Sequence, residues 1–152
     1  MRSPLLGIDP GPEQSGWAIL DLDGVHRSGV DTNDIVLNLV GQWTAKDKGP
    51  VAIEMIASYG MAVGADVFRT CVWIGRYHQI HGGCALLIPR MDVKMHLCHN
   101  SRAKDANIRQ ALIDKLGPPG TRANPGPTYG VKSHAWAALA VAVTAAETRI
   151  NA

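Results

Sequence analysis

Apolar residues at the start of the chain are arranged as expected for consecutive paired strands. Residues 5–9 form an apolar run that ends at the turn Pro10-Gly11-Pro12, and a second apolar pattern occupies residues 17–22. Asp23-Gly24 is a hairpin-turn dipeptide, so residues 25–30 are expected to return as a third strand. The pattern therefore predicts three consecutive strands joined by two turns, and the first strand ends at a polar residue, Asp9.

Later in the chain, short apolar runs alternate with longer segments of helical spacing. The short runs are continuous, as is typical of inner strands, and they occupy residues 51–54 and residues 84–88. Helices are expected over residues 34–45, residues 63–80, residues 92–116 in two pieces joined near Asn100-Ser101, and residues 133–149. Thr32 and Asn33 precede the first helix as capping candidates. The last helix is rich in alanine and should therefore pack closely against the sheet.

This order of elements predicts the fold class. Three strands joined by turns, followed by two strands that each come after a helix, favour an α/β fold with a mixed five-stranded sheet and helices on both faces. The 152 residues are enough for a single domain, residues 1–152. No apolar stretch reaches the roughly 20 residues of a membrane span. No signal-peptide core develops before Asp9, so a cytoplasmic location is expected.

Three cysteines, Cys71, Cys84 and Cys98, give no sign of a disulfide framework. They form no Cys-x-x-Cys pair and their number is odd, so we expect buried, reduced thiols. The segment around Cys98, His96-Leu97-Cys98-His99, has no second ligand pair elsewhere in the chain, which argues against structural zinc.

Charge is divided unevenly between the two halves. Residues 1–75 contain five Lys or Arg against nine Asp or Glu, a net charge of −4, whereas residues 76–152 contain ten against four, a net charge of +6. The basic half is densest around Arg90, Lys94, Arg102 and Lys104. A polyanionic partner such as nucleic acid and an unevenly charged solvated surface both account for this distribution.

Three residues carry the candidate chemistry. Asp9 and Glu54 each end a predicted inner strand, where a carboxylate must be solvated, paired or bound to a metal. His134 lies in the first turn of the last predicted helix, from which its imidazole can face the sheet. Two carboxylates and an imidazole suit Mg²⁺ or Mn²⁺. Taken singly, Asp9 can also cap a turn, Glu54 can pair with a lysine, and His134 can be a core histidine.

Together these residues lie in four motifs that occur in the order of a known family. The segments are Gly7-Ile8-Asp9-Pro10-Gly11-Pro12-Glu13-Gln14-Ser15-Gly16-Trp17-Ala18, Val51-Ala52-Ile53-Glu54, Pro89-Arg90-Met91-Asp92-Val93-Lys94 with Ala103-Lys104-Asp105, and His134-Ala135-Trp136-Ala137-Ala138-Leu139-Ala140-Val141-Ala142. The chain thereby resembles the RuvC-type Holliday junction resolvases of the RNase H-like superfamily. The amino-acid sequence of the last segment resembles that of phage-encoded members.

The resemblance implies a metal-dependent nuclease with Asp9, Glu54 and His134 as ligands of Mg²⁺, for which Mn²⁺ can substitute, and two ions in each site. Family members usually carry acidic residues at two positions of the closing helix, and these fall on His134 and Ala137 here. One expected ligand is therefore missing, and a second ion would depend on phosphate, water or another side chain such as Glu13.

Further roles follow from the same resemblance. Lys94 matches a family lysine that stabilises charge near the scissile phosphate, while Asp105, next to Lys104, stands at the second such position. Tyr59 lies in the loop where resolvases carry an aromatic that stacks on an unpaired base, although Ala57 is nearer to that position. A surface or core aromatic is the other interpretation of Tyr59.

The expected function is cleavage of Holliday junctions or other branched DNA, leaving 5′ phosphate and 3′ hydroxyl ends. Arg90, Lys94, Arg102 and Lys104 are the expected DNA contacts, with Tyr59 as a further candidate. A homodimer is expected because two strands must be cut, with the predicted helix of residues 63–80 as its interface. The apolar face of this helix consists of Val67, Phe68, Cys71, Val72 and Ile74.

Two other functions remain open and one is excluded. A catalytically weakened protein that binds branched DNA is motivated by Ala137, and an RNase H-like nuclease that acts on RNA shares the same motifs. Actin-like and sugar-kinase ATPases also begin with Asp-x-Gly, but they need two duplicated domains around a nucleotide, which 152 residues do not supply.

Overall fold

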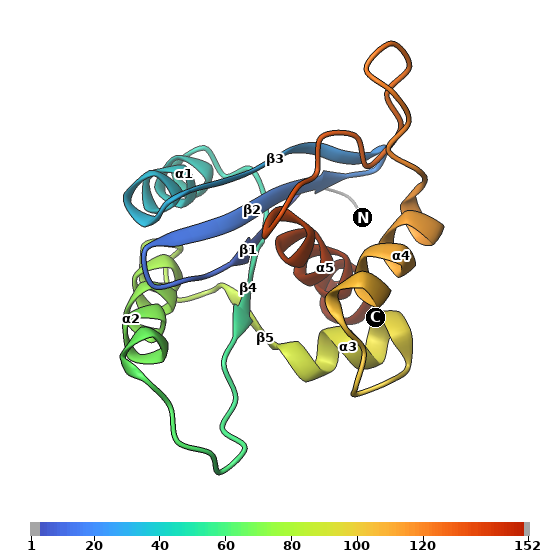
Figure 1. The fold of residues 1–152 in the computed structure, drawn as a ribbon. Coiled ribbons are helices and arrows are strands. Elements are labelled where there is room, and N and C mark those ends of the chain that lie inside the picture. The colour runs from blue at the N-terminus through green and yellow to red at the C-terminus, as the bar shows by residue number, and fades with distance from the viewer. Residues whose placement is uncertain (1–3, 151–152) are drawn as a thin grey trace.

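The computed structural model describes residues 4–150, which form a five-stranded mixed sheet in the order β3-β2-β1-β4-β5 (Figure 1). The strands are β1 (Leu5–Asp9), β2 (Gln14–Asp21), β3 (Gly24–Thr32), β4 (Val51–Met55) and β5 (Leu86–Pro89). The first three are antiparallel neighbours, whereas β1, β4 and β5 run parallel to one another. The predicted mixed five-stranded sheet is confirmed.

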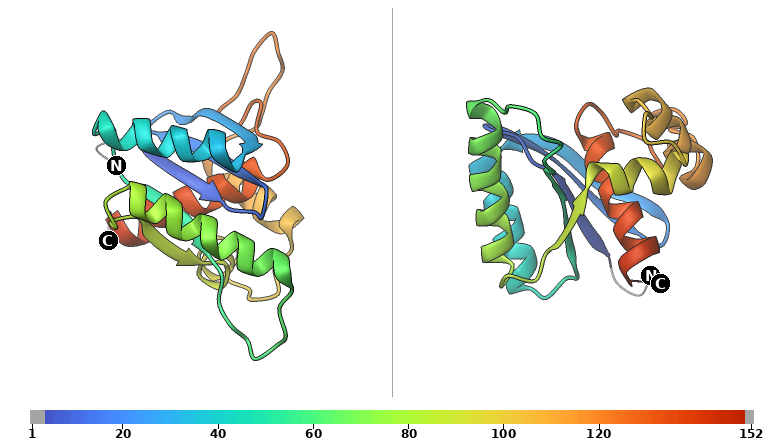
Figure 2. Two further views of the ribbon diagram at one scale, coloured as in Figure 1. Left: turned by 90° about the vertical axis from the view of Figure 1, so that its left-hand side faces the viewer. Right: turned by 90° about the horizontal axis from the view of Figure 1, so that it is seen from below.

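Helices cover both faces of this sheet, as predicted. On one face lie α1 (Asn33–Ala45) and α2 (Ala65–Ile80), which Figure 2 shows side by side. On the other face α5 (Ala135–Ala145) lies against the strands, with α3 (Arg90–Cys98) and α4 (Asp105–Leu116) packed outside it. A π-helical turn, η1 (Ala146–Ile150), continues α5.

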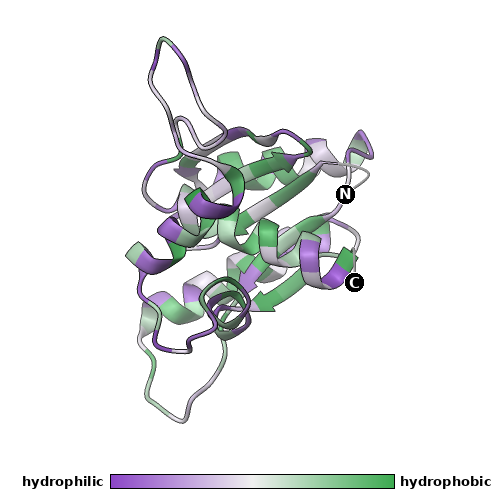
Figure 3. Cartoon of the chain, turned by 90° about the vertical axis from the view of Figure 1, so that its right-hand side faces the viewer, coloured by the Kyte–Doolittle hydropathy of each residue, from purple (hydrophilic) through white to green (hydrophobic). Residues whose placement is uncertain are grey.

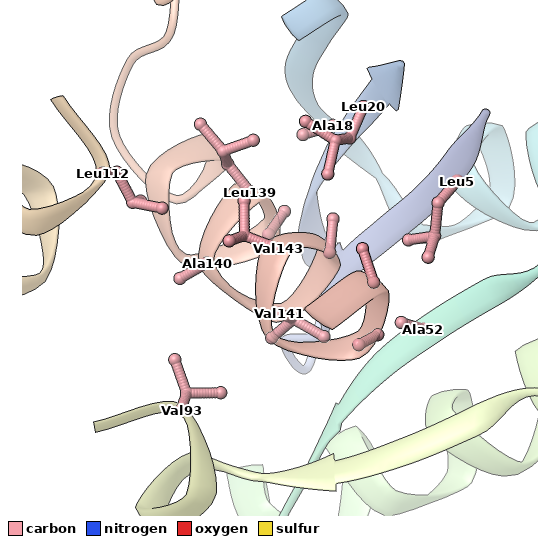
Figure 4. Close-up of a cluster of buried hydrophobic side chains, with 14 of the residues drawn as sticks. Leu5, Ala18, Leu20, Ala52, Val93, Leu112, Leu139, Ala140, Val141 and Val143 are labelled. Atoms are coloured by element: carbon pink, nitrogen blue, oxygen red, sulfur yellow. The ribbon is translucent and has the colours of Figure 1, made fainter. Parts of the chain in front are cut away.

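The alanine-rich α5 approaches the sheet closely, because small residues face each other across the contact. A Cβ atom added at Gly7 of β1 would lie 2.3 Å from the carbonyl oxygen of Ala138, so a larger residue cannot be accommodated there. Figure 4 shows Leu139, Val141 and Val143 of α5 among side chains of the strands and of neighbouring helices. The close packing of this helix fixes its N-terminal end over the sheet.

A second hydrophobic cluster fills the space between the sheet and the α1–α2 layer. It is formed by Leu6, Ile8, Val36, Val40, Trp43, Val51, Ile53, Ile74, Tyr77 and Ala85. Alternation along β1 sends Leu5 to the α5 side and Leu6 to the α1–α2 side, as the period of a strand requires. Figure 3 shows the resulting concentration of hydrophobic residues on the strands.

Element boundaries differ from the predictions at several ends. Strand β2 begins at Gln14, because its pairing with β3 extends to the Gln14–Thr32 pair. Helix α3 begins at Arg90, directly after Pro89, whose extended conformation ends β5 and opens the helix. The predicted helix over residues 133–149 is α-helical only to Ala145, after which the π turn takes over.

Two expectations about burial were wrong. Cys71 and Cys84 are exposed, whereas Cys98 is half-buried and packs against the hydrophobic core. On α2, Ile74 turns toward the sheet and is buried, whereas Phe68 and Val72 are exposed. The apolar residues of α2 are therefore shared between two faces of the helix and do not form one continuous surface. None of the helices formed by residues 4–150 has the length and apolar character that a membrane span requires.

Candidate active site

The three residues selected from the sequence meet at one edge of the sheet. Asp9 is the last residue of β1 and Glu54 lies near the end of β4, and the parallel register that pairs Ile8 with Ile53 brings the two carboxylates side by side. His134 precedes the first residue of α5, and its Nδ1 lies 3.1 Å from Oδ2 of Asp9. A cavity of about 820 Å³ opens over all three side chains.

A buried polar cluster holds the turn that follows Asp9. The side-chain oxygen Oδ1 of Asn33 accepts hydrogen bonds from the hydroxyls of Ser15 (2.7 Å) and Tyr77 (3.0 Å), and its Nδ2 donates to the carbonyl oxygen of Gly11 (2.9 Å). Ser15, Asn33 and Tyr77 are almost completely buried and come from β2, α1 and α2. The cluster therefore ties the turn to three separate elements.

Sequence reasoning missed this cluster. Asn33 was expected to cap α1, but its side chain holds the turn instead, and Thr32 makes no side-chain capping bond. Polar residues inside otherwise apolar patterns could have indicated the cluster, because a polar group that is buried needs hydrogen-bond partners. Ser15 in β2 and Tyr77 on the inner face of α2 both fit that description.

The position of His134 depends on an unusual backbone and a close contact. Ser133 has a left-handed φ of 52°, which turns the chain into α5. A Cβ atom at Gly16 of β2 would lie 2.4 Å from the carbonyl oxygen of His134, so only glycine allows the helix to begin this close to the sheet. The imidazole is largely exposed, which excludes a core histidine.

Burial raises the pKa of both carboxyls, and the charge of Asp9 raises that of Glu54 further. Burial, opposed mainly by the neighbouring imidazole of His134, raises the pKa of Asp9. Burial together with the adjacent charge of Asp9 raises the pKa of Glu54 to about 7, against the opposing effect of Arg90. Two carboxylates held together in a largely desolvated position favour either a proton or a nearby cation.

Arg90 is the cation that the protein itself supplies. Its guanidinium lies 3.6 Å from Oε1 of Glu54 and also contacts the carboxylate of Asp105, the first residue of α4. Glu54 therefore pairs with an arginine, where the sequence had suggested a lysine. Arg90 and Asp105 both line the cavity.

The sequence matches no protein-family model and no curated protein. Among solved structures, it is similar to Thermus thermophilus RuvC with a TM-score of 0.70 at 18% identity, over 94% of this chain and 93% of that one. It is also similar to T. thermophilus RuvC in complex with a Holliday junction substrate, with a TM-score of 0.66 at 17% identity, over 95% of this chain and 93% of that one. The chain has the RuvC fold. The expected RNase H-like architecture is thereby confirmed.

Within this RuvC fold, the predicted basic residues divide into two groups. Arg90 alone of the four lines the cavity described for residues 4–150. Lys94 is half-buried one turn further along α3, while Arg102 and Lys104 are exposed in the connection from α3 to α4. Arg90 is therefore the basic residue of the four that contacts a carboxylate of the site, whereas Lys94 does not line the cavity.

Tyr59 and Ala137 also have definite positions. Tyr59 is 64% exposed in the loop between β4 and α2, so it is a surface aromatic and not a core residue. Ala137 lines the cavity on α5, about one turn after His134, and brings no carboxylate to it. Glu13, its suggested replacement, is exposed at the rim, 3.6 Å from Arg69.

The carboxylates Asp9 and Glu54 fit a Mg²⁺ site in which the protein supplies only a few of the ligands. Among residues 4–150, no three His, Cys, Asp or Glu side chains form a ready-made metal cage. Mg²⁺ is commonly bound through one or two carboxylates together with waters and substrate phosphates, and it needs no such cage. Asp9 and Glu54 supply those carboxylates, side by side where β1 and β4 pair and at the wall of the cavity.

Proposed function

We propose that this protein is a metal-dependent endonuclease that hydrolyses phosphodiester bonds in branched DNA, with Holliday junctions as the first substrate to test. The observation that carries the proposal is the half-buried carboxylate pair, Asp9 and Glu54, which lines a cavity at one edge of the sheet of a RuvC fold. A solved protein of the same fold is in complex with a Holliday junction substrate, which supports the choice of substrate.

Asp9 and Glu54 would hold the divalent ion, with His134 as the third ligand. Mg²⁺ is the expected metal, Mn²⁺ is its substitute, and two ions in each site remain part of the proposal. When bound, such ions make a water more acidic and stabilise the charge that develops on the phosphate and leaving oxygen. Because Ala137 brings no carboxylate, the second ion would depend mainly on the substrate.

The protein's own residues prepare this site in three ways. The Ser15–Asn33–Tyr77 cluster holds the turn after Asp9 and so fixes where this carboxylate points. His134, whose Nδ1 lies 3.1 Å from Oδ2 of Asp9, restricts the same carboxylate by a direct contact. Burial keeps bulk water from screening the two charges, which strengthens their attraction for a cation.

DNA binding is proposed for the basic second half of the chain. Arg102 and Lys104 are exposed close to the cavity, since the next residue, Asp105, lines it. Lys94 and Arg90 lie on α3, the helix that this connection follows. Such residues would neutralise phosphates and release counterions, whatever the DNA sequence.

A homodimer is proposed because a four-way junction must be cut in two strands. Phe68 and Val72 are 64% and 61% exposed on α2, and Tyr59 and Met61 lie in the exposed loop that precedes this helix. Exposed large apolar side chains such as these are enriched at protein interfaces. Closed two-fold symmetry would place one active site on each of two strands.

Cleavage of synthetic substrates tests the proposal. A labelled four-way junction should be cut in Mg²⁺ or Mn²⁺, while a linear duplex of the same sequence should remain intact. Asp9→Asn and Glu54→Gln should each abolish cleavage but retain junction binding in a gel-shift assay, because they remove metal ligands and not DNA contacts. Binding without cleavage by the wild type would favour the catalytically weakened DNA-binding protein, and cleavage of RNA in a hybrid duplex would favour the RNA nuclease.

A further inference from the structure

Arg90 joins two carboxylates that lie on different elements and differ in exposure. One guanidinium nitrogen is 3.6 Å from Oε1 of Glu54, whose side chain is 15% exposed, and another contacts Asp105, whose side chain is 90% exposed. Arg90 itself is 37% exposed, between these two extremes. The guanidinium thus bridges a buried carboxylate at the metal site and an exposed one at the start of α4.

The two contacts have different electrostatic consequences. Glu54 lies beside Asp9 and needs a counter-charge, and arginine stays protonated at any accessible pH, so Arg90 is the permanent counter-ion of the metal-free site. A divalent cation at the Asp9–Glu54 pair would neutralise the same carboxylate and repel the guanidinium. Asp105 belongs to another helix, and it offers Arg90 a partner that the metal does not use.

We propose that Arg90 and the divalent cation compete for Glu54, and that Asp105 retains Arg90 when the cation binds. This inference rests on the proposed metal site. Arg90 is then a positioning residue for the metal, and Asp105 acts only through Arg90. The planar fork of the guanidinium, with its five N–H donors, can leave one carboxylate while it remains bonded to another.

Binding of Mn²⁺, followed by isothermal titration calorimetry without DNA, tests the competition. Arg90→Gln should tighten Mn²⁺ binding about tenfold, which corresponds to about 1.4 kcal/mol, because the competing cation is removed. Asp105→Asn should weaken binding several-fold, because Arg90 then rests on Glu54 alone. In the Arg90→Gln background, Asp105→Asn should have almost no effect, since the residue through which Asp105 acts is gone.

Two variants control for the simple loss of charge. Arg109 and Asp66 also line the cavity, but Arg109 lies over the ring of Trp136 and Asp66 pairs with Arg69, so neither contacts Asp9 or Glu54. Arg109→Gln and Asp66→Asn should change Mn²⁺ affinity much less than the matching substitutions at Arg90 and Asp105. Arg90→Lys keeps the charge but loses the fork, and it should bind Mn²⁺ with an affinity between those of the wild type and Arg90→Gln.

The possible failures are distinguishable. If Asp9→Asn leaves Mn²⁺ binding unchanged, the metal is held elsewhere, and the proposed function and this inference both fail. If Asp9→Asn abolishes binding but Arg90→Gln does not tighten it, only the competition is refuted. An equal effect of Asp105→Asn in the wild type and in the Arg90→Gln background would show general electrostatics and overturn the role of Asp105.

Discussion

Replacement of Glu54 by glutamine should stabilise the metal-free protein at alkaline pH, although it removes an ion pair with Arg90. Glutamine imitates the protonated carboxyl, which is the form that the buried site favours. The folded-state pKa of Glu54 is raised from 4.5 to about 7, so the wild type loses stability as the pH rises through this interval. The variant has no such group and should not show this loss.

The size of the effect follows from the pKa values. A rise from 4.5 to about 7, at about 1.4 kcal/mol for each tenfold change in proton affinity, corresponds to about 3 kcal/mol when Glu54 is fully ionised in both states. Glu54 is largely protonated in the folded protein near pH 5 and largely ionised near pH 8. The difference in unfolding free energy between variant and wild type should therefore rise by about 2 to 3 kcal/mol between these pH values.

Urea unfolding in EDTA, followed by tryptophan fluorescence at both pH values, measures this difference. Glu147→Gln is the matched control, because hydrogen bonds from His96 and Lys115 lower the pKa of Glu147 despite its partial burial. Because a lowered pKa leaves Glu147 largely ionised in both the folded and the unfolded protein at pH 5 and pH 8, Glu147→Gln should destabilise the protein by a similar amount at both pH values and show no comparable rise. If Glu54→Gln loses stability relative to the wild type between pH 5 and pH 8, the argument from burial and repulsion is wrong.

Three further predictions concern the helix start, the third ligand and the DNA surface. Gly16→Ala should lower the melting temperature, because its Cβ would lie 2.4 Å from the carbonyl oxygen of His134, whereas Gly75→Ala, in open space on α2, should leave it unchanged or raise it. His134→Ala should lose most junction cleavage in Mg²⁺, and His134→Asp should retain it; normal cleavage by the alanine variant in both Mg²⁺ and Mn²⁺ would place the third ligand elsewhere. Replacement of Arg102 and Lys104 together by glutamine should flatten the salt dependence of junction binding by about two phosphate contacts, and an unchanged slope would place the DNA on another surface.

Local patterns in the sequence were sufficient for the elements and for the identity of the carboxylates. The strand and helix periods are local, because they depend only on residues a few positions apart in the sequence. The order of the elements they define predicted the mixed sheet and its two helical layers. Asp9 and Glu54 were recognised for the same reason, since each directly follows an apolar run that forms an inner strand. His134 was selected from its place in the first turn of the last predicted helix and from the motif around it, and in the structure it contacts Asp9.

Only the tertiary structure decided how these residues are held and charged. Arg90 was selected as a DNA contact, and its pairing with Glu54 and Asp105 appears only in the structure, because it depends on how α3 and α4 pack. Tyr77 meets Ser15 from a point 62 residues further along the chain, a separation that no local period encodes. The raised pKa of Glu54 has the same origin, because desolvation and repulsion exist only once β1 and β4 are paired and covered. Sequence patterns therefore determined which groups are present at the site, and long-range packing determined their partners and their charge.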